Sequence, residues 1–169
     1  GFAGALAEAE PARVRRVVEV NVLGALFCAR AALPSLARSP RAASLIFTSS
    51  LQGVMARAQR SVYTASKHAI VGLTKALALE AAPQGVRVNA IAPASTDTPF
   101  LRTQLEAAGA QDIDRAVAQA AAAMPLGWLP TPEDFADAAV FLASPAARSI
   151  TGHNLVIDCG ASAGIFRRG

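Results

Sequence analysis

Residues 44–67 read SLIFTSSLQGVMARAQRSVYTASK, and this stretch decides the fold. Its apolar start, 44–49, is typical of a buried strand, and a loop over 51–60 follows. Ser61 is placed to cap a helix over 62–82, which the turn residues at 83–85 would end. A buried strand that leads through a loop into a long helix is typical of parallel α/β folds.

The rest of the chain continues this alternation. Pro11 starts a predicted long helix over 11–37, in which Pro34 predicts a distortion or a stop. Thr131, followed by Pro132 and two acidic residues, predicts another helix start. Strands are also predicted at 86–92 and 154–158, and further helices at 100–108, 113–123 and 132–143. We therefore predict one α/β domain over 169 residues, with three parallel strands and flanking helices.

The most informative side chains are Tyr63 and Lys67, four residues apart on the predicted helix. At that spacing both project from one face. A free tyrosine titrates near pH ~10, and a fixed ammonium nearby favours the tyrosinate and lowers that pKa. The pair therefore suits a general acid or base that acts on an alcohol or carbonyl oxygen, although the same spacing also occurs on ordinary surface helices.

Two other polar positions are candidates for the same site. Ser50 follows the predicted strand 44–49, at the end where open α/β sheets bind ligands, and its hydroxyl can bond a substrate oxygen. Thr48 and Ser49 are alternatives for this hydroxyl. Asn21 places an amide inside an otherwise apolar helix, where a satisfied buried amide is the structural alternative to a functional one.

In order and spacing, Asn21, Ser50 and Tyr63-x-x-x-Lys67 resemble the short-chain dehydrogenase/reductase family over about 10–160. The resemblance implies a doubly wound, Rossmann-like parallel sheet and hydride transfer between NAD or NADP and an alcohol or ketone. It covers the C-terminal two-thirds of the family fold. The family's first strand and its turn of the form Thr-Gly-x-x-x-Gly-x-Gly are not in these residues, so we expect a partial Rossmann-like fold, either a fragment or a truncated product.

The resemblance also assigns catalytic roles. Tyr63 would give a proton to a carbonyl oxygen or take one from an alcohol, and Lys67 would hold the nicotinamide ribose hydroxyls. Ser50 would orient the substrate oxygen, which it would share with Tyr63, and the spacing to Tyr63 favours it over its two neighbours. Asn21 would hold a water molecule in a proton relay.

Contacts with the nicotinamide half of the cofactor would come from the segment after the strand 86–92. Pro93 and Thr96 would contribute backbone groups and Thr98 a hydroxyl, although Thr98 also suits a helix cap before Pro99. Ala94 stands where the family has glycine, so a left-handed backbone there would cost about 1 kcal/mol. Because the Gly-rich turn supplies the pyrophosphate donors, we expect weak binding of NAD or NADP by these 169 residues alone.

Composition bounds the partners. The net charge is +4, and the arginines are scattered rather than clustered, which disfavours nucleic acid. The longest uncharged apolar run, 20–29, is too short to span a bilayer, and Cys28 and Cys159 fit neither a metal site nor a disulfide framework. We expect a cytoplasmic protein with reduced thiols, no metal and no membrane partner, whose substrate is a small alcohol or ketone. The substrate-binding region is predicted at about 94–130.

Two interpretations of function stay open. The chain is either the catalytic part of an NAD- or NADP-dependent dehydrogenase or reductase, or an inactive, truncated family member that acts as an oligomerisation module. Small residues on the predicted helices permit close packing, and the family pairs the corresponding helices between subunits, which implies a homodimer or homotetramer. Arg57 and Arg60, in the loop beside the predicted site, are either solvated or bind an acidic substrate or acyl carrier.

Overall fold

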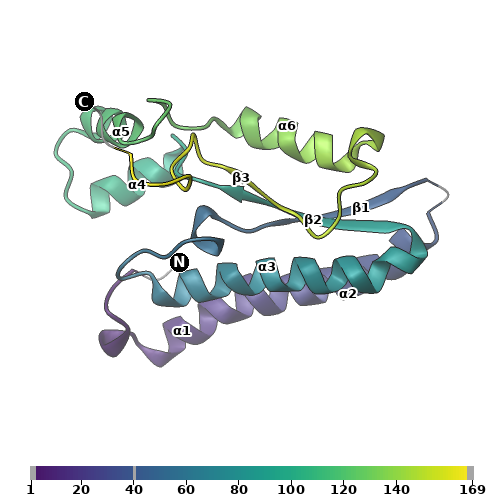
Figure 1. Cartoon of the computed structure of the whole chain (residues 1–169). Helices are drawn as coiled ribbons and strands as arrows, with labels where there is room; N and C mark the ends of the chain where they lie inside the picture. Colours follow the sequence, from purple (N-terminus) through teal and green to yellow (C-terminus); the bar gives the residue numbers. More distant parts are fainter. Residues whose placement is uncertain (1–2, 40, 167–169) are drawn as a thin grey trace.

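The computed structural model describes residues 3–39 and 41–166, and it confirms the α/β fold. Three parallel strands, β1 (Ala43–Thr48), β2 (Val86–Pro93) and β3 (Asn154–Ile157), form one sheet in the order β1-β2-β3. The helices are α1 (Pro11–Val18), α2 (Gly24–Ala37), α3 (Ser61–Ala81), α4 (Pro99–Ala107), α5 (Ile113–Ala122) and α6 (Pro132–Ala143). Figure 1 shows α1, α2 and α3 along one face of the sheet and α6 along the other. Helices α4 and α5 lie beyond the carboxyl end of β2.

Burial on both faces explains the near-continuous apolar strands. Alternate residues of β2, such as Val88 and Ala90, pack with buried Ile70 and Leu77 of α3. Ile91 faces the opposite way and packs in a second cluster under α6. The register, from Ala43 opposite Val86 to Thr48 opposite Ile91, brings the carboxyl ends of β1 and β2 together. This edge of the sheet carries the candidate site.

The predicted helix over 11–37 is continuous but not uniform. Between α1 and α2 lies one π-helical turn, Glu19–Leu23, and Asn21 is at its centre. Pro34 does not stop the helix where it stands, because α2 runs on to Ala37. By length and composition, the 27-residue helix Pro11–Ala37 is long and apolar enough to cross a membrane. The uncharged run 20–29 alone is too short to do so. Core helices of soluble proteins and N-terminal signal sequences pass the same test.

The predicted helix start at Thr131 is confirmed, whereas the predicted cap at Ser61 is not. Thr131 and Asp134 form a capping box, in which the Thr131 hydroxyl accepts from the Asp134 amide at 3.3 Å and the Asp134 carboxylate accepts from the Thr131 amide at 2.7 Å. Ser61 is not a cap, which corrects the prediction. It lies inside α3, and Arg60 is the residue that precedes the helix.

Arg87 fixes α6 to the sheet, and nothing in its sequence context indicates this. Its side chain is buried beneath α6 and donates hydrogen bonds to the carbonyls of Leu142 at 2.6 Å, Ser144 at 3.3 Å and Ala143 at 3.4 Å. A guanidinium suits this place because the carbonyls at a helix C-terminus have no partners within the helix and carry partial negative charge.

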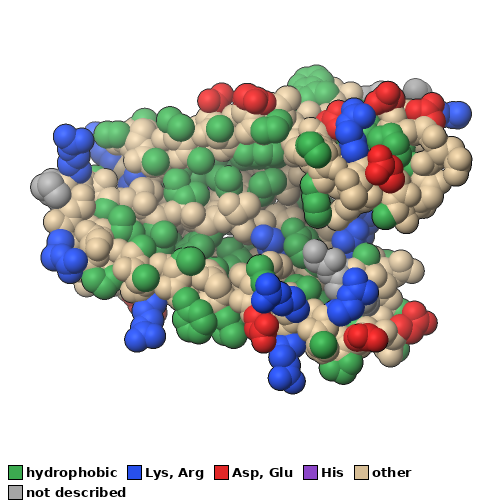
Figure 2. Space-filling model, turned by 180° about the vertical axis from the view of Figure 1, so that it is seen from behind, with side chains coloured by type: hydrophobic (Ala, Val, Ile, Leu, Met, Phe, Trp, Pro, Cys, Tyr) green, Lys and Arg blue, Asp and Glu red, His purple; other side chains and the backbone are tan. Residues whose placement is uncertain are grey.

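Within the described residues, β1 pairs with β2 alone and forms one edge of the sheet. Seen from behind, apolar side chains fill the band between the two helix layers on this side (Figure 2). In the part of the chain that the structure describes, the sheet therefore has an open, apolar edge at β1. Such an edge presents unpaired backbone groups and invites pairing with another strand.

Candidate active site

A cavity of about 490 Å³ lies beyond the carboxyl ends of β1 and β2. Its walls come from the β1–α3 loop, the start of α3, the segment after β2, and α4. Six of the seven predicted site residues line it, namely Ser50, Tyr63, Lys67, Pro93, Thr96 and Thr98. Asn21 is not among the lining residues. The structure therefore brings six of these residues, from three separate segments, to one cavity.

Tyr63 and Lys67 occupy adjacent turns of α3 and face the same cavity. The Lys67 Nζ lies 5.7 Å from the centroid of the Tyr63 ring and donates a hydrogen bond to the Thr48 carbonyl at 2.9 Å. This bond fixes the ammonium at the end of β1. Burial lowers the pKa of Lys67, because partial desolvation disfavours the charged form. An ammonium held in this way favours an anionic or strongly polar partner in the cavity.

The three neighbouring hydroxyls near the end of β1 differ in their contacts. Ser49 is buried and donates to the Asn154 side-chain oxygen at 2.6 Å, so its hydroxyl hydrogen is engaged away from the cavity. Ser50 accepts from the Gln52 amide at 3.1 Å, and no hydrogen bond among the described residues uses its hydroxyl hydrogen. Thr48 contributes its carbonyl to Lys67. These contacts favour Ser50 over Ser49 as the hydroxyl that can donate to a ligand.

Asn21 acts on the site from a distance. Its Nδ2 donates to the Ser66 hydroxyl at 3.0 Å, and Ser66 donates to the Tyr63 carbonyl at 2.7 Å. The π turn that carries Asn21 thus contacts the turn of α3 that carries Tyr63. The Nδ2 of this amide therefore has a partner within the fold. The role of Asn21 in a proton relay stays a prediction.

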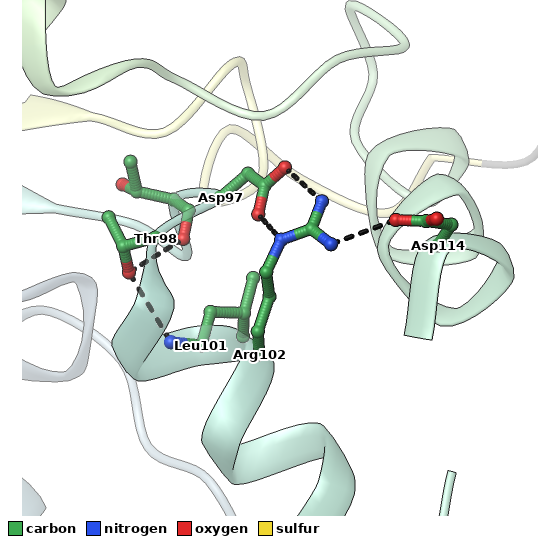
Figure 3. Close-up of polar contacts among 6 residues, drawn as sticks. Asp97, Thr98, Leu101, Arg102 and Asp114 are labelled. Atoms are coloured by element: carbon green, nitrogen blue, oxygen red, sulfur yellow. Dashed lines mark hydrogen bonds and ion pairs between the residues drawn. The ribbon is translucent and has the colours of Figure 1, made fainter. Parts of the chain in front are cut away.

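The segment after β2 is held by one capping contact and one charge network (Figure 3). Thr98 caps α4, since its hydroxyl accepts from the Leu101 amide at 3.3 Å, which confirms the structural alternative for this residue. Arg102 grips Asp97 through two hydrogen bonds of 2.8 and 2.9 Å and reaches Asp114 of α5 at 2.8 Å. One guanidinium therefore joins the loop, α4 and α5. The sequence analysis did not predict this network, because a spacing of five residues does not place two side chains on the same face of a helix or a strand.

We expect this network to weaken in acid. Hydrogen bonds from Arg102 hold the pKa of the Asp97 carboxyl below its usual range, so Asp97 stabilises the fold above its unfolded pKa and loses that contribution as pH falls through its folded pKa. Thermal unfolding of Asp97→Asn should therefore show a lower Tm than the parent chain at about pH 7, with the gap closing below about pH 4. Asp137→Asn, on α6, is the control. A gap that persists unchanged into acid would contradict the assignment.

The left-handed backbone expected at Ala94 occurs at Cys159 instead. Ala94 is not in the left-handed region, so the cost predicted for it does not arise. Cys159, which follows β3, has φ 52°. A side chain there costs on the order of 1 kcal/mol. Cys28 and Cys159 are both free thiols, and burial raises the pKa of Cys159.

The comparisons with known proteins agree with this fold. The sequence profile described as Enoyl-(Acyl carrier protein) reductase matches residues 1–162. The chain belongs to the short-chain dehydrogenase/reductase family. Its relative (-)-trans-carveol dehydrogenase from Rhodococcus erythropolis is 35% identical over 155 residues, which cover 86% of this chain and 55% of that protein.

Solved structures of the family agree. Ligand-free aldohexose dehydrogenase from Thermoplasma acidophilum matches with a TM-score of 0.93 at 34% identity and covers 99% of this chain and 66% of its own. ElxO with NADP bound matches with a TM-score of 0.85 at 29% identity, over 97% of this chain and 64% of its own. The chain spans 55% to 61% of the length of the first curated relatives it matches. Family membership establishes an oxidoreductase relationship and implies a nicotinamide cofactor.

Proposed function

We propose that this chain carries the catalytic part of an oxidoreductase that transfers hydride between NAD or NADP and a small alcohol or ketone. The observation that carries the proposal is the convergence of Tyr63, Lys67 and Ser50 on one cavity. Each contributes a different function to carbonyl chemistry, namely a proton, a fixed cation and a hydroxyl donor. The dehydrogenases among its relatives support the same reaction class.

In this proposal Tyr63 is the general acid for reduction and the general base for oxidation. Ser50 donates its free hydroxyl hydrogen to the substrate oxygen and orients it toward Tyr63. Lys67, held by the Thr48 carbonyl, keeps positive charge beside the Tyr63 ring and favours the tyrosinate left after proton transfer. Asn21 positions this turn of α3 through Ser66.

The residues present fit the nicotinamide half of the cofactor. Pro93, Thr96 and Thr98 line the cavity beside Lys67, whose ammonium suits ribose hydroxyls. The cofactor, when bound, supplies or accepts the hydride. The pyrophosphate half depends on the Gly-rich turn, which these 169 residues do not contain.

Nucleotide titration tests the proposal. We expect calorimetry on the chain of residues 1–169 to show no binding of NADH or NADPH at micromolar concentration. We expect such binding in the extended protein, defined here as this chain with the N-terminal segment of the Thermoplasma relative joined ahead of it. The extended protein should also reduce a cyclic ketone at the expense of one nucleotide. Tight binding by the chain alone, or no turnover by a folded extended protein, would contradict the proposal.

The second candidate function is an interaction module without catalysis. It is favoured by one observation, the exposed apolar side chains of Val20 (52%), Leu23 (39%) and Phe27 (60%) on the helix that runs from α1 to α2. In either case we propose assembly into a homodimer or homotetramer in the cytoplasm. Turnover by the extended protein separates the two functions, because a pure interaction module would bind no nucleotide productively.

A further inference from the structure

Two arginine side chains enter the candidate cavity from the loop between Ser50 and Tyr63. Arg57 and Arg60 both line it, the first exposed and the second half-buried. Neither has an ion pair or a side-chain hydrogen bond with another described residue. Both guanidinium groups are therefore available to a ligand in the same space as Tyr63.

The charge of the cavity is unbalanced. Among the residues that the structure describes, its lining includes Arg57, Arg60 and Lys67 but no aspartate or glutamate. The acidic residue nearest in sequence to the cavity wall is Asp97, which is neutralised by its two bonds to Arg102. A concave surface with one sign of charge concentrates ligands of the opposite sign. The cavity therefore favours an anionic group, and Arg57 and Arg60 supply positive charge in addition to that of Lys67.

A tight turn holds the two arginines together. The Arg60 amide donates to the Arg57 carbonyl at 3.2 Å, so the two residues are the ends of a turn whose Cα atoms lie within about 7 Å. Gln59, between them, has φ 60°, and its carbonyl accepts from the Gly4 amide at 2.9 Å. The Thr64 amide in turn bonds the Arg60 carbonyl at 2.8 Å. The backbone thus fixes the two positions from which these side chains extend into the lining of the cavity.

The remaining walls are largely apolar. Leu51 and Met55 line the cavity from the loop, and Phe100 and Leu101 line it from α4. These side chains suit a hydrocarbon body, and the same lining includes the hydroxyls of Ser50 and Tyr63 and the side chains of Arg57 and Arg60. The cavity therefore combines groups that suit a reacting oxygen with cations that suit an anion, and apolar side chains form part of its wall.

We propose that Arg57 and Arg60 bind a carboxylate, so that the substrate is a hydroxy acid or keto acid with a hydrocarbon body. Guanidinium groups bind carboxylates through paired, charge-assisted hydrogen bonds, which gives both affinity and orientation. Only the alcohol or ketone half of this substrate rests on the proposed function. The acid half rests on the two arginines and the absence of acidic side chains in the lining.

Binding of non-reacting probes tests the acid half without any turnover. Cyclohexanecarboxylate should bind residues 1–169 at least about 10-fold more tightly than cyclohexanecarboxamide, the neutral probe of matched shape. Arg57→Gln and Arg60→Gln should each reduce that preference by about 3- to 10-fold, with the smaller effect at the more exposed Arg57. The double variant should abolish it, and Arg60→Lys should retain part of it. Arg38→Gln, at the exposed residue that follows α2, is the matched control.

The outcomes are distinct. Equal binding of acid and amide, no binding of either, or a preference that survives in the folded double variant would overturn the proposal. Stronger binding of phenyl phosphate, lost in the same variants, would overturn the carboxylate assignment and indicate a phosphate ester. Circular dichroism confirms that each variant is folded.

Kinetics of the extended protein separate this proposal from the proposed function. We expect kcat/KM for 4-hydroxycyclohexanecarboxylate to exceed that for its methyl ester by about 10-fold or more, with the ratio falling toward one in the double variant. Equal values for both substrates would sink the carboxylate proposal and leave the oxidoreductase intact. If the extended protein turns over neither substrate but the preference for the carboxylate probe is preserved, the proposed oxidoreductase activity is contradicted and the proposed anion site stands.

Discussion

Replacing Tyr63 by phenylalanine is expected to lower kcat of the extended protein by at least about 100-fold, the usual scale of general acid–base catalysis. The change removes the one phenolic hydroxyl in the cavity and keeps the aromatic ring beside Lys67. Ring packing and the Lys67 contact with Thr48 should survive, so the loss should fall on the chemical step. Steady-state assays with saturating nucleotide and ketone measure it directly.

The control for Tyr63→Phe is nucleotide affinity, which should stay within a few-fold of the parent value. A variant that binds nucleotide and turns over at the parent rate would show that Tyr63 is not the proton-transfer residue. A variant that loses both properties would point to misfolding, and a thermal melt distinguishes that case from a specific loss.

Replacing Lys67 by methionine is expected to lower kcat by at least about 10-fold and to raise the KM for the nucleotide. Methionine keeps most of the length of the side chain but loses the charge and the bond to the Thr48 carbonyl. Because burial shifts the pKa of Lys67 and the variant lacks this titrating group, the pH profile of kcat in the oxidation direction should shift in the variant. Rates of alcohol oxidation between about pH 6 and pH 10 give this shift.

Lys75→Met is the matched control, since Lys75 lies on the exposed side of α3. It should leave the pH profile and the nucleotide KM unchanged. If Lys67→Met also leaves both unchanged, Lys67 is an ordinary surface lysine and the charge in the cavity has no part in catalysis.

Much of this molecule follows from local sequence rules. The strand at β1, the helix α3 and the Tyr63–Lys67 face follow from apolar runs and helical periodicity, because four residues on a helix return to the same side. The start of α6 follows from Thr131 and Asp134, whose side chains satisfy the first amides of the helix. These features depend on residues only a few positions apart, so they can be predicted from short stretches of sequence.

The features that sequence reasoning missed depend on partners far along the chain or on backbone geometry. Arg87 finds its acceptors at the end of α6, more than fifty residues away. The Arg102 bond to Asp114 depends on how α4 and α5 come together, which no local spacing specifies. The left-handed backbone at Gln59 and Cys159 could not be predicted, because neither residue type is typical of that conformation. Only glycine at such positions gives a clear signal.

Transfer of deuterium tests the central claim most directly. The extended protein is given a cyclic ketone and NADH or NADPH deuterated at the hydride position, and mass spectrometry follows the alcohol formed. We predict one deuterium on the carbinol carbon of the product, formed at least about 100-fold more slowly in Tyr63→Phe. Nucleotide binding without deuterium in the alcohol, or equal transfer rates in the parent and Tyr63→Phe proteins, would contradict the account.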